Sequence, residues 1–134
     1  MHGQKDNGPK DGAALELPAG GEVNVELACN KDFTSFGGQG GGNDPCPPDT
    51  PSMHAGTPVQ DSQLRGCALA IAYKNNILDV QPEDLVVFSV NQRCVKDKNT
   101  AFKVPEGMPA CDGKCICAWL WQGQESSNEM VSAL

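Results

Sequence analysis

The sequence predicts an all-β fold, an antiparallel β-sandwich with a long Gly/Pro-rich loop. Five short segments carry the residue patterns of β-strands, Gly/Pro-containing turns separate them, and no segment has the periodicity of an amphipathic helix. Short strands joined by such turns are typical of two facing sheets around one core. With 134 residues, of which 39% are hydrophobic, the chain is long enough to form one domain with a buried core.

The chain divides into two parts by composition. Residues 1–14 are polar and rich in Gly, Lys and Asp, which predicts a disordered or irregular N-terminal segment. Residues 15–134 are predicted to form the β-sandwich core. Its first strand is expected at residues 22–28, where apolar and polar side chains alternate with the period of a half-buried strand.

Four further segments are rich in apolar and β-branched residues and are predicted to be strands: residues 67–73, 85–90, 100–104 and 115–121. The first of these is continuously apolar, as central strands are. Turns are expected at residues 81–84 and 105–109, where prolines fall between the strands. Residues 125–134 carry no strand assignment and suggest that a further strand is missing.

A long irregular segment is expected from residue 33 to about residue 62. It contains a glycine run at residues 37–42 and a proline cluster at residues 45–48. The glycine run lacks the Lys-Ser/Thr ending of a phosphate-binding loop, which favours a flexible surface loop. Loops of this length in compact domains are usually functional or disordered.

The net charge of −7 excludes several classes of partner. Binding to nucleic acid requires a basic stripe, and the sequence has none. An anionic membrane surface would repel this chain, and no apolar stretch approaches the length of a membrane span. A neutral polysaccharide would not be repelled. The predicted partners therefore include neither nucleic acid nor membrane.

Seven cysteines in a short chain predict an oxidising compartment and several disulfides. The odd number leaves at least one without a partner inside the chain, so we expect up to three disulfides and one thiol. The spacing of the last three cysteines does not fit a paired zinc-binding motif. No apolar targeting run follows Met1, which predicts that a secretion signal lies outside this chain. The disulfide candidates are Cys29, Cys46, Cys67, Cys94, Cys111, Cys115 and Cys117.

The sequence offers few residues for chemistry, and no catalytic residue is assigned. Of the two histidines, His54 lies in the polar, proline-rich part of the long loop. From the residues alone, an ordinary exposed histidine is the favoured interpretation. The functional alternative is a metal ligand, because a neutral imidazole suits copper and zinc.

Trp119 and Trp121 are expected on one face of the last predicted strand. They could form a substrate-facing platform on which sugar rings stack. Aromatic residues with this spacing more often pack between sheets, and that interpretation is favoured.

Five segments together resemble the fungal, xylan-active lytic polysaccharide monooxygenases of auxiliary activity family 14. The segments are residues 15–21, 51–54, 66–73, 82–90 and 104–121. The resemblance runs in unbroken order from about residue 12 to residue 130. It implies a secreted protein with an immunoglobulin-like (fibronectin III-like) sandwich and a surface copper site, the histidine brace, that oxidatively cleaves xylan on cellulose.

The resemblance also implies the copper ligands. His54 matches the second histidine of the brace, whereas the N-terminal histidine of the mature family has no counterpart here. His2 corresponds to an internal stretch of the family, and the axial tyrosine position holds Val131. We therefore expect a form that is truncated at both ends, lacks terminal strands and binds copper weakly or not at all. The family's final strand normally contributes one more cysteine, which would account for the odd count.

Two other functions remain open at this point. The chain could be a non-catalytic polysaccharide-binding or structural β-sandwich module, or a copper-handling relative that uses His54, Met53 and His2. Missing terminal strands would expose sheet edges, so self-association through these edges is also expected.

Overall fold

The structure is a computed structural model that describes residues 13–35, 37–38, 42–47, 53–55, 58–124 and 129–133. The described secondary structure consists of strands and short 3₁₀ helices, without an α-helix. The strands are β1 (Glu22–Glu26), β2 (Cys67–Ala72), β3 (Val86–Asn91), β4 (Asn99–Lys103), β5 (Ile116–Gln122) and β6 (Glu129–Ala133). The 3₁₀ helices are η1 (Lys31–Phe33), η2 (Asp61–Gln63), η3 (Ile77–Asp79) and η4 (Pro82–Asp84).

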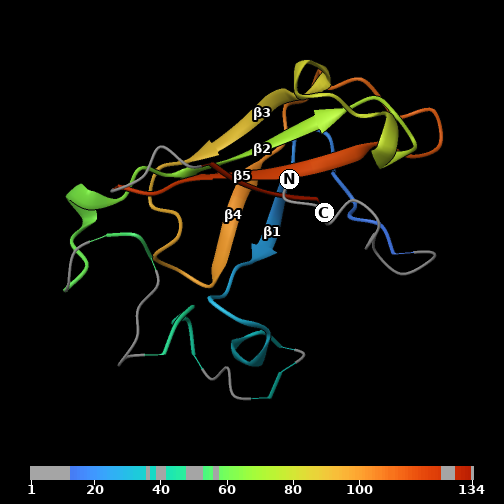
Figure 1. Cartoon of the computed structure of the whole chain (residues 1–134). Helices are drawn as coiled ribbons and strands as arrows, with labels where there is room; N and C mark the ends of the chain where they lie inside the picture. Colours follow the sequence, from blue (N-terminus) through green and yellow to red (C-terminus); the bar gives the residue numbers. More distant parts are fainter. Residues whose placement is uncertain are drawn as a thin grey trace.

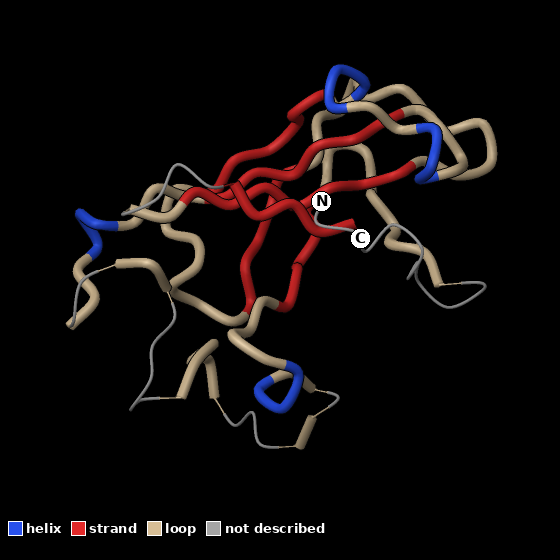
Figure 2. The backbone as a smooth tube through the Cα atoms, in the orientation of Figure 1, coloured by secondary structure: helices blue, strands red, loops and turns tan. Residues whose placement is uncertain are grey.

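The strands form two antiparallel sheets. One is the pair β1–β4, and the other has the order β3-β2-β5-β6. Figure 1 shows the β1–β4 pair lying across the larger sheet as a second layer. The helical turns occupy connections between strands (Figure 2). None of the helices in the described part of the chain is long and apolar enough to cross a membrane. The predicted all-β sandwich is confirmed, and its immunoglobulin-like topology stays a prediction.

All five predicted strands are confirmed, with ends that differ by at most two residues. The turn expected at residues 81–84 contains η4, and the one at residues 105–109 is closed by a hydrogen bond from the Met108 amide to the Pro105 carbonyl. The structure adds β6, in a segment to which the sequence analysis assigned no strand. Its five residues include one β-branched side chain, so the strand depends on its ladder with β5. Residues 1–12 of the expected irregular segment lie outside the described residues.

The core lies between the two sheets. Cys67 and Leu69 of β2 stand directly opposite Trp121 and Trp119 of β5, so all four side chains share the inner face of the larger sheet. The β1–β4 pair contributes inward side chains that include Phe102, which is 1% exposed. Burying a side chain of this size contributes roughly 1.5–3 kcal/mol to folding. The core therefore depends on contacts between strands that are far apart in the sequence.

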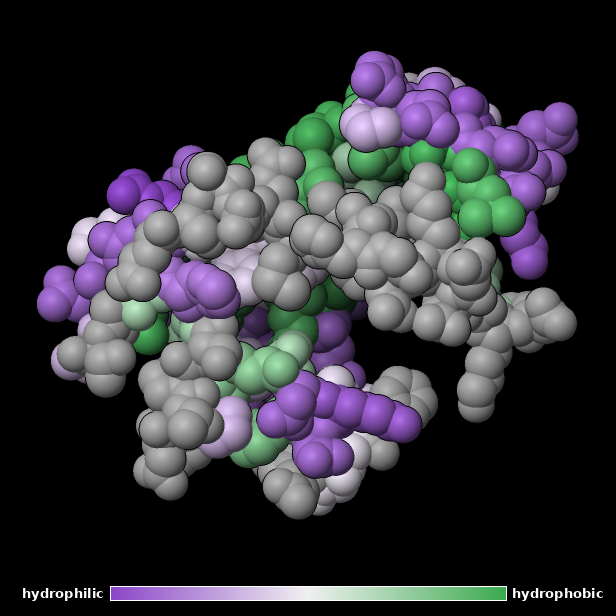
Figure 3. Space-filling view, viewed as in Figure 1, coloured by the Kyte–Doolittle hydropathy of each residue, from purple (hydrophilic) through white to green (hydrophobic). Residues whose placement is uncertain are grey.

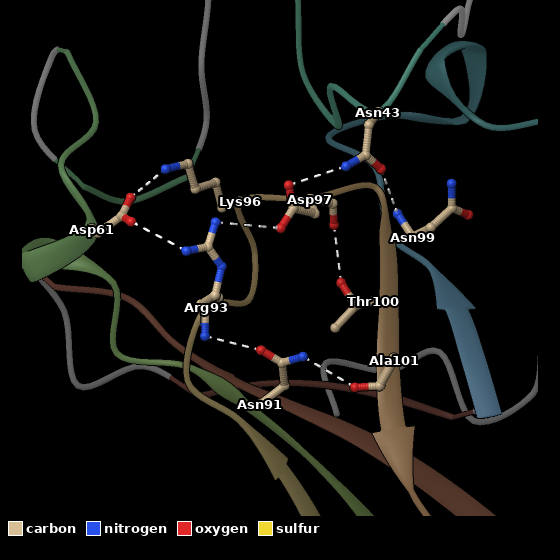
Figure 4. A network of polar contacts seen from close by, with 9 residues as sticks. All are labelled: Asn43, Asp61, Asn91, Arg93, Lys96, Asp97, Asn99, Thr100 and Ala101. Carbon is tan, nitrogen blue, oxygen red and sulfur yellow. Dashed lines mark hydrogen bonds and ion pairs between the residues drawn. The ribbon is translucent and has the colours of Figure 1, made fainter. Parts of the chain in front are cut away.

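The connection between β3 and β4 is fixed by covalent and polar contacts. The Cys67–Cys94 disulfide joins it to β2, and both cysteines are buried. A group of polar residues then ties this connection to the loop that carries His54. We call it the loop-end network; its members are Asn43, Asp61, Arg93, Lys96, Asp97 and Asn99 (Figure 4).

Asn43 fixes the loop on the N-terminal side of His54. Its side-chain amide donates to Asp97 Oδ1 at 3.1 Å, and its Oδ1 accepts from the Asn99 amide at 3.2 Å. Its carbonyl accepts from the Lys98 amide at 2.8 Å. Three positions after Asn43, Cys46 forms a disulfide with Cys29. This part of the loop is thus attached both to the β3–β4 connection and to the segment after β1.

Asp61, in η2, fixes the loop on the C-terminal side of His54. Its carboxylate accepts hydrogen bonds from the Lys96 ammonium and from Arg93 Nη1, the latter at 3.4 Å. The hydrogen bond from Lys96, with the positive charges of Lys96 and Arg93, holds the pKa of Asp61 below its ordinary value. The same connection therefore holds the chain on both sides of His54.

The lowered pKa of Asp61 predicts a pH-dependent contribution to stability. A carboxyl group whose pKa is lower in the folded state stabilises the protein above its unfolded pKa, about 3.9, and this contribution is lost as the pH falls through the folded value. Replacing Asp61 with Asn should lower the urea midpoint at pH 7, and the difference from the wild type should shrink below about pH 4. The matched control is Asp112→Asn, at an exposed aspartate in the Cys111–Cys115 loop, which should leave the midpoint unchanged. If the urea midpoints of Asp61→Asn and the wild type still differed by the same amount at pH 2, the lowered pKa of Asp61 would not be the cause.

Candidate functional site

His54 lies at the protein surface, as the sequence analysis expected, and its side chain is exposed. Its backbone has a φ of 45°, in the left-handed region that non-glycine residues adopt rarely. The carbonyl of His54 accepts a hydrogen bond of 2.8 Å from the amide of Gln124, two residues beyond the end of β5. The loop is thereby bound to the end of β5 at the position of the histidine itself.

The imidazole of His54 and the indole of Trp121 form an edge-to-face contact. The ring centroids are 5.1 Å apart and the planes meet at 89°. Trp121 is only 9% exposed and belongs to the core between the sheets. Edge-to-face ring contacts contribute about 0.5–1.5 kcal/mol beyond the area they bury. The imidazole is thus exposed to solvent on one side and supported by the core on the other.

A cavity of about 430 Å³ lies beside this ring pair. Its lining comes from the end of β1 and the segment after it, from Pro45 and Cys46, from Val95, and from His54, Trp119 and Trp121. The volume is within the range of small-molecule sites, roughly 300–1,000 Å³. The indole Nε1 of Trp119 is buried and has no hydrogen-bond partner among the described residues.

Trp119 and Trp121 share one face of β5, as predicted from their spacing. Their rings stack with centroids 6.0 Å apart and planes inclined by 21°. Trp121 is part of the core cluster, and the partly buried Trp119 packs against it. This placement favours the interpretation as packing between the sheets. A contact of either ring with substrate stays a prediction.

The cysteines form three disulfides: Cys29–Cys46, Cys67–Cys94 and Cys111–Cys115. Cys117 is free and buried, and its burial raises the pKa of its thiol. The expected count of three disulfides and one thiol is therefore confirmed. Zinc coordination by the last three cysteines, which the sequence analysis disfavoured, is incompatible with the Cys111–Cys115 bond.

Among the described residues, His54 has the chemistry and exposure that suit a copper ligand. The exposed, well-supported imidazole of His54 suits a metal ligand, because a neutral ring nitrogen binds copper well. Within the described ranges, no group of three or more His, Cys, Asp or Glu side chains is placed to hold a metal ion. His2 lies outside those ranges, and Val131, opposite Leu120 in the β5–β6 ladder, carries no ligand atom. Met53, named in the copper-handling alternative, is partly buried against the core.

Sequence reasoning did not identify the residues that support His54. Gly123 and Gln124 follow β5 without any recognisable motif, and Asn43 and Asp61 belong to a loop that was expected to be irregular. Only the position of Gly123 directly after a strand rich in aromatic residues could have drawn attention to it.

Comparison with known proteins identifies relatives that match almost the whole chain. The sequence model of the family described as "Lytic polysaccharide monooxygenase AA14" matches residues 1–131. The chain is 48% identical to "AA14 family lytic polysaccharide monooxygenase A" of Trametes coccinea (strain BRFM310), over 98% of this chain and 32% of the relative. It is 46% identical to "AA14 family lytic polysaccharide monooxygenase B" of Pycnoporus cinnabarinus, over 98% of this chain and 37% of the relative.

A third relative, "AA14 family lytic polysaccharide monooxygenase B" of Trametes coccinea (strain BRFM310), is 44% identical over 98% of this chain and 33% of its own length. The chain thus spans about a third of the length of these curated relatives. The family match covers all of the described strands apart from the last two residues of β6. This chain belongs to the AA14 family of lytic polysaccharide monooxygenases.

Proposed function

We propose that this chain is part of a secreted, copper-dependent lytic polysaccharide monooxygenase that oxidatively cleaves xylan on cellulose, and that His54 is one of its copper ligands. The observation that carries the proposal is the exposed imidazole of His54, supported from below by Trp121 and bound through its carbonyl to the end of β5. Family membership supplies the reaction class.

The support beneath His54 matches what a surface metal site requires. Ligand side chains must be held close to their productive positions by packing and hydrogen bonds, and an error of about 1 Å is enough to spoil a site. An insoluble polysaccharide can reach only groups that are exposed at the surface. The copper ion would supply the redox chemistry, and His54 would contribute one ring nitrogen on a fixed part of the surface.

One of the two remaining ligands of the family is proposed to come from the rest of the longer protein. The family resemblance assigns it to the N-terminal histidine of the mature protein. The other, an axial tyrosine, belongs at the position where this chain has Val131, which cannot bind the metal. Secretion is supported by the three disulfides, which form and persist in oxidising compartments.

A non-catalytic polysaccharide-binding module is the second candidate function. It is favoured because, among the described residues, no group of three or more His, Cys, Asp or Glu side chains is placed to hold a metal ion. In this alternative the sandwich contacts polysaccharide, and His54 is an ordinary surface histidine.

Copper titration of this chain should show weak binding, because one imidazole does not supply the set of nitrogen ligands that holds the ion. Isothermal titration with Cu(II) measures the affinity directly, and His54→Ala should remove most of the remaining heat. Tight one-to-one binding by the wild-type chain would contradict the incomplete ligand set.

A chimera tests the enzymatic proposal. In it, residues 13–124 of this chain replace the matching segment of the 48% identical Trametes relative, which supplies all other parts. Incubated with xylan-coated cellulose, copper and ascorbate, the chimera should release oxidised oligosaccharides. The His54→Ala chimera should bind copper more than about 100-fold more weakly and release none, since loss of a ligand exceeds the 10–100-fold effect of outer partners.

The unaltered relative is the positive control for this assay. A folded chimera that is retained on the substrate but releases no oxidised product would support the non-catalytic module instead.

Self-association is proposed to involve the edge strand β3. Among the described strands of the larger sheet, β3 pairs with β2 alone, and Val86, Val87 and Val90 are 58%, 50% and 64% exposed. Figure 3 shows hydrophobic surface over this strand. An exposed apolar edge without charged residues is a template for pairing with another chain.

Light scattering at increasing protein concentration should therefore detect oligomers of the wild-type chain. Val90→Lys should reduce them, because a charged side chain disfavours edge pairing. The control is Leu78→Lys in η3, at a residue that is 56% exposed and lies in the β2–β3 connection, outside β3 itself. A wild-type chain that stays monomeric would refute this proposal.

A further inference from the structure

Gly123 lies against His54 more closely than any other residue type would allow. It follows β5 directly and is buried. A Cβ atom built on it would lie 2.8 Å from His54 Cβ, 3.4 Å from Cγ and 3.6 Å from Nδ1. The first of these separations is one that real Cβ atoms essentially never show.

Steric exclusion, and not backbone freedom, is the reason for a glycine here. The φ of Gly123 lies outside the left-handed region, so its backbone would accept other residues. The atom that blocks a side chain is His54 Cβ, which is attached directly to the backbone and cannot rotate away. An alanine at this position therefore requires the backbone of His54 or of residue 123 to move.

Such a movement would disturb every contact that supports His54. Gln124, directly after Gly123, donates its amide hydrogen bond to the His54 carbonyl. Trp121, two residues before Gly123, supplies the indole that contacts the imidazole. Residues 121–124 thus meet the histidine through the indole ring of Trp121, the Gly123 backbone without a side chain, and the hydrogen bond from Gln124.

We infer that Gly123 is a positioning residue for His54, whose missing side chain allows the histidine to dock on the end of β5 with its imidazole over Trp121. The functional meaning of this docking rests on the proposed role of His54 as a copper ligand. The docking itself can be tested without copper, so it can fail or succeed separately from the proposed function.

The first experiment compares Gly123→Ala with Gly107→Ala. Gly107 is the matched control because a Cβ there meets no atom within 4 Å and its φ is also outside the left-handed region. Thermal unfolding gives Tm, and nuclear Overhauser effects between the ring protons of His54 and Trp121 report the docking. Gly123→Ala should lower Tm and abolish these ring-to-ring effects, whereas Gly107→Ala should change neither.

The second experiment is a double-mutant cycle with His54→Gly. This substitution removes the Cβ that blocks position 123, and glycine tolerates the φ of 45°. In the His54→Gly background, Gly123→Ala should therefore leave Tm unchanged. A purely structural role of Gly123, independent of His54, would give the same loss of Tm in both backgrounds.

These outcomes decide the inference in each case. Equal loss of Tm in the two backgrounds, or ring-to-ring effects that survive in Gly123→Ala, would overturn it. If Gly123→Ala does not fold, the double variant Gly123→Ala/His54→Gly should still fold, because it lacks the clash. The inference would equally be overturned if neither Gly123→Ala nor the double variant folded while His54→Gly alone did.

Discussion

The packing of Trp121 between the two sheets is the contact on which both the core and the candidate site depend. Its indole is 9% exposed, faces Cys67 across the β2–β5 ladder, and stacks on Trp119. The same indole contacts the imidazole of His54, with 5.1 Å between the ring centroids. A tryptophan suits this double role, because it buries a large apolar area and still presents a ring edge or face to a neighbour. The position of the histidine is therefore coupled to the packing of the sandwich.

An exposed loop residue is held in place here by contacts on both sides of it and beneath it. Asn43 and Asp61 attach the flanking segments to the β3–β4 connection, which the Cys67–Cys94 disulfide fixes to β2. The left-handed backbone of His54 costs free energy, of order 1–3 kcal/mol for a non-glycine residue, and persists where surrounding contacts determine it. Conformations of this kind cluster at functional sites, in agreement with the proposed role of His54.

The strands could be predicted from the sequence because periodicity and β-branched residues are local signals, as at Val23 and Val25 in β1. β6 was missed because its pairing with β5, and not its own composition, makes it a strand. Family resemblance singled out His54, but its support could not be foreseen, since Gly123 and Asp61 meet their partners only after distant segments fold together. Likewise, seven cysteines predict three disulfides without revealing which pairs form.

The proposed role of His54 as a copper ligand depends on the docking of this histidine on the end of β5. Anomalous diffraction at the copper edge, from copper-soaked crystals of a protein that combines this segment with the remaining length of an AA14 relative, tests it most directly. We expect an anomalous peak bonded to a ring nitrogen of His54, with the imidazole still in edge-to-face contact with Trp121. Copper bound elsewhere, with the imidazole of His54 free of metal, would contradict it.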